Sequence, residues 1–157
     1  MIDAPRIVQT SAQPTAVIHL TVPRAEIRNV MGPGLRELHA ALAAQGLAPT
    51  GPWFSHHLRR HPEVFDFEIS IPVASAIPPV GRVQASELPA ATVARTIYRG
   101  PYEGLGAAWG EFRAWVSANG YVAAEDLWEC YVSGPESGPD PDQWCTELNQ
   151  PLIGHDS

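Results

Sequence analysis

Apolar residues recur at helical spacing in two segments of the chain, 35–47 and 109–121. In each segment they stand at positions i, i+3 and i+7, which places them on one face of a helix. A glycine follows where each helix is expected to end, because glycine takes the left-handed backbone conformation without steric cost. The equivalent pairs share one offset in sequence number (109 − 35 = 74): Leu35 and Trp109, Leu38 and Phe112, Leu42 and Val116, Gly46 and Gly120, and Leu47 and Tyr121.

Extended segments rich in β-forming residues stand on both sides of each predicted helix. Segments 16–22 and 91–98 precede the helices, and each is opened by a proline, Pro14 or Pro89, at an offset of 89 − 14 = 75. Two more strands follow each helix, and the final strands align at an offset of 79. The second hairpin loop, residues 133–142, is therefore about five residues longer, and it consists of turn-forming residues. The strands after the helices are 53–58 and 65–73 in the first half and 127–132 and 144–152 in the second.

These repeats predict an α+β fold of two pseudo-symmetric β-α-β-β units. We place the first repeat at about residues 14–73, the second at about 89–152 and a linker at 74–88, all within a single domain of residues 1–157. The linker is too short and too apolar to tether two independent domains. One repeat alone would leave an apolar sheet face partly uncovered, whereas two repeats complete a core and form a groove suited to a small ligand.

The composition is that of a packed globule, with 45% hydrophobic and 17% charged residues. The net charge of −7 opposes binding to nucleic-acid phosphates, so we expect no direct nucleic-acid partner. The only compact basic stretch, Arg59-Arg60 among histidines, is typical of a solvated turn. No apolar run approaches the roughly 18 residues of a membrane span, and the N-terminus lacks the order of a signal peptide. We therefore expect a cytoplasmic protein with no membrane partner.

We expect no metal, disulfide or cofactor. Cys130 and Cys145 lack metal-ligand spacing, and a reducing compartment keeps such thiols reduced. His56 and His57 are adjacent on a predicted strand and point to opposite faces, so they do not converge with His61 on one ion. The chain also lacks a glycine-rich phosphate loop, a nucleophile elbow and a dinucleotide fingerprint. Hydrolysis by a positioned water remains open.

An ordered set of motifs marks the second half of the chain: Leu88-Pro89, Tyr98-Arg99-Gly100-Pro101-Tyr102, the helix from Trp109 to Trp115, Trp128-Glu129-Cys130-Tyr131 and Thr146-Glu147-Leu148. With these motifs the second half resembles the GyrI-like small-molecule-binding family, which is also the effector-binding domain of some AraC-type and MerR-type regulators. The first half fits the same family through Gly51-Pro52-Trp53-Phe54 and the strand that ends at Pro72-Val73, so the likeness covers roughly residues 14–152.

The resemblance implies a bacterial protein with an antiparallel sheet, both helices on one face and a ligand pocket between the helices. Many members bind large, planar, often cationic drugs. Some hydrolyse the cyclopropane ring of DNA-alkylating toxins inside an aromatic cage. Only about 13 residues precede the first predicted strand, too few for a helix-turn-helix, so we expect a stand-alone member.

Glu129 is the strongest functional candidate. It lies mid-strand between Trp128 and Cys130, where an unpaired carboxylate is costly. The resemblance implies that the glutamate of this Glu-x-Tyr pattern sits in the pocket, while a structural carboxylate hydrogen-bonded to a neighbouring strand or to an arginine is the alternative. Tyr131 lies two residues along the strand and therefore faces the same side. Desolvation in the pocket would raise the pKa of Glu129 toward that of an acid or base.

The offset of 74 assigns Ser55 and His57 to the positions of Glu129 and Tyr131 in the first half. Together with Trp53 they form a row on one face of the matching strand, so we expect both halves to line the pocket. Trp53 is either a cage wall or a surface aromatic. His57 is either a hydrogen-bonded wall residue or a base.

Three further aromatic residues are candidate ligand contacts. Tyr98 and Tyr102 flank the Gly100-Pro101 turn, where their rings either reach the groove or pack against the start of the helix. Trp109 begins the apolar stripe of the second helix and belongs either to the core or to the cage.

Three functions follow from these candidates. The first is binding of hydrophobic, aromatic xenobiotics, cations included, with Glu129 as the anchor. The second is a hydrolase that opens the cyclopropane ring of a toxin, with Glu129 and Tyr131 as the catalytic pair acting on water. The third and weakest is interference with DNA gyrase, as the family name implies. In each case we expect a monomer or a weak dimer.

Overall fold

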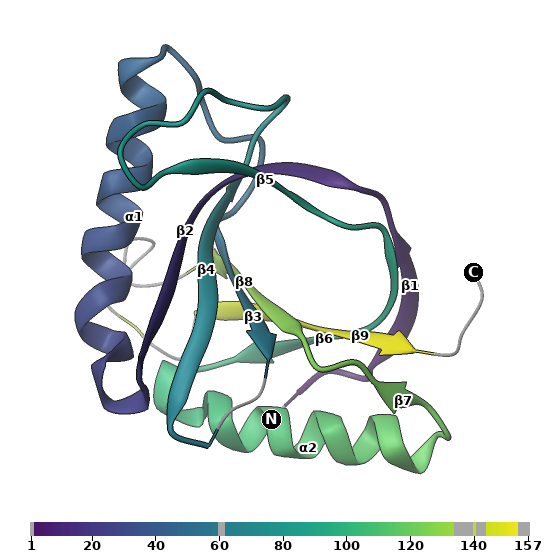
Figure 1. Ribbon diagram of the computed structural model, residues 1–157. Helices are drawn as coiled ribbons and strands as arrows, with labels where there is room; N and C mark the ends of the chain where they lie inside the picture. Colours follow the sequence, from purple (N-terminus) through teal and green to yellow (C-terminus); the bar gives the residue numbers. More distant parts are fainter. Residues whose placement is uncertain (1, 60–61, 134–139, 141–143, 154–157) are drawn as a thin grey trace. The chain divides into compact units, whose positions relative to one another are not determined.

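The computed structural model describes residues 2–59, 62–133, 140 and 144–153. Two segments singled out in the sequence fall outside this range: Arg60 and His61 of the basic stretch, and most of the loop 133–142. The chain forms two compact units (Figure 1). The N-terminal unit is Ser11–Ala90, and the C-terminal unit combines Met1–Thr10 with Ala91–Ser157.

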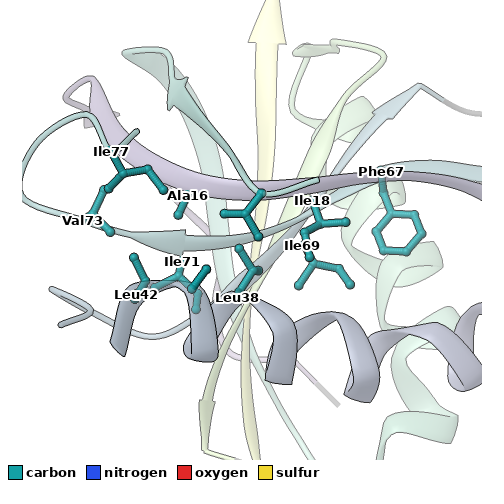
Figure 2. Close-up of a cluster of buried hydrophobic side chains, with 11 residues drawn as sticks. Ala16, Ile18, Leu38, Leu42, Phe67, Ile69, Ile71, Val73 and Ile77 are labelled. Carbon is teal, nitrogen blue, oxygen red and sulfur yellow. The ribbon is translucent and has the colours of Figure 1, made fainter. Parts of the chain in front are cut away.

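The N-terminal unit is a four-stranded antiparallel sheet in the order β3-β4-β2-β5, with one long helix packed against β2 and β4. Apolar residues on the inner face of the helix meet the alternating apolar residues of both strands, as Figure 2 shows for Leu38 and Leu42 over Ile69 and Ile71. The elements are β2 (Gln13–Pro23), the 3-10 helix η1 (Arg24–Glu26), α1 (Ile27–Ala44), β3 (Phe54–Arg59), β4 (Val64–Pro72) and β5 (Gln84–Leu88).

The C-terminal unit repeats this plan. Its main sheet has the order β1-β6-β9-β8, a short strand β7 also pairs with β9, and all pairs are antiparallel. The fully buried Phe112 belongs to the core cluster, which also contains Ala94, Leu148 and Leu152. The elements are β1 (Arg6–Thr10), β6 (Ala91–Arg99), η2 (Tyr102–Gly104), α2 (Leu105–Ala118), β7 (Val122–Ala123), β8 (Leu127–Ser133) and β9 (Cys145–Ile153).

The α+β class and the repeat are confirmed, and the helices end as predicted. Gly46 and Gly120 have φ values of 70° and 79°, in the left-handed region. The second hairpins also match position for position. Ser55 pairs with Ile69 in the N-terminal unit, and Glu129 pairs with Leu148 in the C-terminal unit, which reproduces the predicted offsets of 74 and 79. A register shift follows at the same repeat position in each hairpin, between residues 57 and 59 and between 131 and 133.

The predicted offset of 75 between the first strands is wrong. Thr15 pairs with Pro72 and Val93 pairs with Pro151, so equivalent positions on β2 and β6 differ by 93 − 15 = 78. The first residues of α1 and α2 show the same offset (105 − 27 = 78), but α1 has 18 residues and α2 has 14. The difference of four residues is about one helical turn, which keeps the apolar face of both helices on the sheet.

Two strands were not expected, and they are exchanged between the sequence repeats. β1 lies before the first predicted repeat, and β5 lies in the segment predicted as a linker. β1 pairs with β6 of the second repeat, while β5 pairs with β2 of the first. Their registers are equivalent, since Val8 opposes Val93 and Ser86 opposes Thr15, again an offset of 78.

No helix in the described part of the chain is long and apolar enough to span a membrane.

Candidate functional site

Glu129 lies in the C-terminal unit on β8, on the face that meets α2. Strand alternation puts its side chain on the same side as Leu127 and Tyr131, and only 9% of the residue is exposed. The Tyr131 hydroxyl donates a hydrogen bond of 2.7 Å to Oε1, and the Trp109 indole Nε1–H donates one of 2.6 Å to Oε2. Both oxygens of the carboxylate therefore accept a hydrogen bond from an aromatic side chain.

The electrostatics of Glu129 are dominated by burial. Desolvation raises the pKa of this carboxyl, and the hydrogen bonds from Tyr131 and Trp109 lower it by a smaller amount, so the net direction is upward. No cationic side chain among the described residues forms an ion pair with Glu129, and the Arg113 guanidinium lies 5.8 Å from the centre of the Trp109 ring. The carboxylate therefore has neutral donors and no counter-charge within the described part of its unit.

An aromatic chain leads away from the carboxylate. The Tyr131 and Tyr102 rings are 6.0 Å apart in an edge-to-face arrangement, and the Tyr102 and Trp144 rings are 5.0 Å apart. Tyr131 is buried, whereas Tyr102 and Trp144 are partly exposed. These rings connect the buried carboxylate with the surface of the C-terminal unit and provide stacking faces.

Trp144 was missed as a candidate, because the strand register that relates it to Tyr131 is seen only in the structure. Thr146 is the cross-strand partner of Tyr131, and Trp144 lies two residues before Thr146. The period of two along the strand therefore assigns Trp144 to the face of Tyr131. The Thr146 hydroxyl on this face is fully buried and has no hydrogen-bond partner in the described structure. Such a group is costly unless a water or ligand satisfies it.

Trp109 combines the two roles that the sequence left open. Its ring is packed in the core cluster, 5.6 Å from Phe112, and its indole N–H binds Glu129. Tyr98, in contrast, is only 5% exposed, and its hydroxyl donates to the Pro101 carbonyl at 2.8 Å. That arrangement favours packing at the turn for Tyr98 and the aromatic chain for Tyr102.

The N-terminal unit carries the second group of candidates. Ser55 is fully buried, and its Oγ lies 3.2 Å from His57 Nε2. Burial, with smaller contributions from His56 and Arg24, lowers the pKa of His57 to about 4, so the ring is neutral at physiological pH. Trp53 is partly buried against the core of this unit. The structure thus brings Ser55 and His57 together here, and Trp109, Glu129, Tyr131 and Tyr102 together in the C-terminal unit.

The remaining titratable groups of the described part of the chain were compared with the needs of a metal or thiolate site. Among the described residues, no three of His, Cys, Asp and Glu converge to hold a metal ion. Cys130 and Cys145 are free thiols. Burial, reinforced by the Glu147 carboxylate, raises the pKa of Cys130 to about 12, so its reactive thiolate is scarce.

Comparisons with known proteins agree in family and fold. The family model of the GyrI-like small molecule binding domain matches residues 3–152. No curated protein is significantly similar in sequence. The C-terminal domain of EcmrR superposes with a TM-score of 0.82 at 23% identity, covering 95% of this chain and 96% of that domain. In the EcmrR–DNA complex the TM-score is 0.84 at 23% identity, with 95% of this chain covered, but the chain spans only 57% of that longer EcmrR chain.

Two more distant structures share the fold. SAV2435 bound to tetraphenylphosphonium has a TM-score of 0.68 at 9% identity, with 97% of this chain and 95% of SAV2435 covered. A hydrolase from Listeria innocua has a TM-score of 0.69 at 10% identity, with 94% of this chain and 91% of the hydrolase covered.

Proposed function

The chain belongs to the GyrI-like small molecule binding domain family, and on that basis we propose that it binds hydrophobic, aromatic small molecules at Glu129, cations included. One observation carries the proposal. Glu129 is a buried carboxylate whose described partners, Trp109 and Tyr131, are neutral. When Glu129 is ionised, its negative charge therefore has no counter-ion in the described part of its unit.

A lipophilic cation complements this site in two ways. It supplies the missing positive charge at low desolvation cost, because its own charge is weakly hydrated. It also places aromatic or apolar groups against the rings of Tyr102, Tyr131 and Trp144, which attract cations through their faces. The tetraphenylphosphonium complex of SAV2435, a protein of the same fold, supports this choice of ligand class.

The biological setting is also part of the proposal. We assign the ligands to xenobiotics and the protein to the cytoplasm, where its free thiols stay reduced. EcmrR was solved on DNA as a longer chain, and the net charge of −7 supports a ligand-binding role without direct DNA contact for this chain. A monomer or weak dimer is sufficient for ligand binding at Glu129, because the described residues around Glu129 come from one unit.

The test uses ions of one shape and opposite charge. Tetraphenylphosphonium should quench the tryptophan fluorescence saturably, whereas tetraphenylborate should not bind. In Glu129→Gln, which keeps the side-chain shape, we expect tetraphenylphosphonium to bind roughly 10- to 100-fold more weakly, since one close charge pair is removed. Neutral triphenylphosphine oxide should lose little affinity. Equal losses for the cation and the neutral compound would refute charge pairing at Glu129.

The affinity for the cation should also depend on pH in one direction. Because burial raises the pKa of Glu129, its charge is lost at a higher pH than that of an ordinary glutamate. Binding should therefore strengthen as the pH rises through that pKa, and Glu129→Gln should show no such rise.

Hydrolysis remains a second candidate because the Tyr131 hydroxyl contacts a carboxyl of raised pKa, the arrangement of an acid and base pair. The likeness to a hydrolase from Listeria innocua is a likeness of fold. Mass spectrometry of a cyclopropane-bearing alkylating toxin incubated with the protein tests this directly. Turnover to a water-added, ring-opened product that is abolished in Glu129→Ala supports the enzyme, and unchanged toxin contradicts it.

A further inference from the structure

We propose that Tyr98 is a positioning residue: its hydroxyl fixes the turn that carries Tyr102, and this turn holds the Tyr102 ring against Trp144. The residues involved all belong to the C-terminal unit. The consequence for ligand affinity rests on the function proposed above for Glu129, whereas the placement of the ring does not.

Hydrogen bonds tie the turn between β6 and α2 at both of its sides. The Pro101 carbonyl accepts a bond of 2.8 Å from the Tyr98 hydroxyl and one of 3.1 Å from the Gly104 N–H. The Gly100 N–H donates a bond of 3.0 Å to the Trp144 carbonyl. Because Tyr98 is only 5% exposed, water replaces its hydroxyl poorly. The backbone of the turn is therefore bound to a buried side chain of β6 and to the residue that precedes β9.

Two glycines make room for the Tyr98 hydroxyl. A Cβ on residue 104 would overlap this hydroxyl, and a Cβ on residue 100 would lie 2.9 Å from it. Gly100 also has a φ of 142°, a backbone conformation that residues with a side chain rarely adopt. Both glycines therefore allow the turn to close around the hydroxyl.

The Tyr102 ring depends on the backbone of this turn. Its centre lies 5.0 Å from that of the Trp144 ring and 6.0 Å from that of Tyr131, whose hydroxyl binds Glu129. A tyrosine ring is placed by only two side-chain torsions, so its position follows that of the backbone closely. A turn that moves would separate the partly exposed rings of Tyr102 and Trp144.

The N-terminal unit provides an internal comparison, because η1 is the equivalent of η2 at an offset of 102 − 24 = 78. At this offset Leu20 takes the place of Tyr98, and Glu26 takes the place of Gly104. Leucine has no hydroxyl that needs space, and the glycine is absent as well. The hydroxyl and the glycine therefore occur together, in keeping with their contact in the C-terminal unit.

The residue after the proline contacts the same aromatic position in both units. In the C-terminal unit Tyr102 meets Trp144, and in the N-terminal unit the Arg24 guanidinium lies 4.4 Å from the centre of the Phe65 ring. Phe65 and Trp144 are equivalent at the offset of 144 − 65 = 79. A long arginine side chain has many rotamers with which to reach a ring, whereas a tyrosine ring needs a fixed backbone. The hydroxyl and the glycine therefore accompany the unit in which a tyrosine ring is placed at the turn.

Ligand-free protein tests the placement of the ring. Nuclear Overhauser effects between the ring protons of Tyr102 and Trp144 should be present in the wild type and should weaken in Tyr98→Phe, which removes only the hydroxyl. Thr96→Val is the matched control, because the Thr96 hydroxyl, also on β6, donates a bond of 2.7 Å to the Asp3 carbonyl outside the turn. It should leave these effects unchanged. Their absence from the wild type, or equal strength in the wild type and Tyr98→Phe, would overturn the proposal.

A double-mutant cycle tests the consequence for binding of tetraphenylphosphonium. Tyr98→Phe should weaken binding about fivefold, the contribution of one neutral hydrogen bond to a preorganised site. In the Tyr102→Ala background the same substitution should have no effect, because the ring that it positions is gone. Thr96→Val should leave the affinity unchanged. Equal losses from Tyr98→Phe in the two backgrounds would overturn positioning through Tyr102.

The two proposals can fail separately. A wild type that does not bind tetraphenylphosphonium would contradict the function proposed for Glu129. The ring contacts of the ligand-free protein would still decide whether Tyr98 holds Tyr102 in place.

Discussion

Replacing Tyr131 with phenylalanine tests whether the Glu129 carboxylate is held by charge-assisted hydrogen bonds. The substitution removes the hydroxyl that donates to Oε1 at 2.7 Å and leaves the ring in place. Both residues are buried, with 8% and 9% exposed, so water replaces the lost donor poorly. A hydrogen bond to an ionised group contributes about 1.5–3 kcal/mol, and one between neutral groups about 0.5–1.5 kcal/mol.

The loss of stability should therefore depend on pH. The pKa of Glu129 in the folded protein is above its ordinary value of 4.5. Below both values the carboxyl is protonated in both states, and Tyr131→Phe should cost about 1 kcal/mol. Above the folded pKa the carboxylate is charged, and the cost should rise to about 2 kcal/mol. The extra ~1 kcal/mol corresponds to a further increase of roughly 0.7 in the pKa of Glu129.

Urea unfolding at intervals between pH 4 and pH 9 measures this cost. Tyr98→Phe is the control, because the Tyr98 hydroxyl donates its hydrogen bond of 2.8 Å to the neutral backbone carbonyl of Pro101. Its effect on the free energy of unfolding should be the same at every pH. A cost of Tyr131→Phe that does not change across the pH range would refute the assignment of a charged, hydrogen-bonded carboxylate.

Two further predictions concern stability. Gly104→Ala should destabilise the protein by about 1–3 kcal/mol, because a Cβ at residue 104 overlaps the Tyr98 hydroxyl. The control Gly106→Ala, in open space on α2, should be neutral or stabilising by up to about 1 kcal/mol. Equal changes in melting temperature for the two variants would contradict this packing. Folding lowers the pKa of His57 from 6.5 to about 4, so the free energy of unfolding should decrease as the pH drops from 6.5 toward 4, by up to roughly 3 kcal/mol. An NMR titration that gives His57 an ordinary pKa would contradict this prediction.

The hairpin that follows the helix in each repeat, β3–β4 and β8–β9, was predicted from the sequence together with its register. The pattern of two along a strand fixes the face of each residue, and the constant offset fixes which residues are equivalent. The prediction failed for the first strands because a proline sets φ without setting register. Pro14 lies within β2, whereas Pro89 precedes β6. The extra turn of α1 was also hidden, since Pro33 and its neighbouring glycines are poor helix formers that tertiary packing overrides.

The exchanged strands and parts of the site depend on contacts that no local pattern encodes. β1 and β5 are five-residue edge strands, and the partner of each lies distant in sequence. The bond from Trp109 to Glu129 joins a helix to a strand 20 residues later, and helical periodicity alone predicted Trp109 equally well as core. The alternation of β8 did assign Glu129 and Tyr131 to one side, and the structure joins them by a hydrogen bond.

Because β1 and β5 are exchanged, the order of the strands along the chain differs from their grouping into the two units. A chain cut near residue 80 yields two sequence repeats, each of which lacks the edge strand of its own sheet and carries that of the other. This is the connectivity of a strand-swapped dimer written as one polypeptide. A circular permutant that begins at Ser11 and carries residues 1–10 after residue 157 would make each unit continuous in sequence. In that permutant each sheet with its helix could be produced as one uninterrupted fragment.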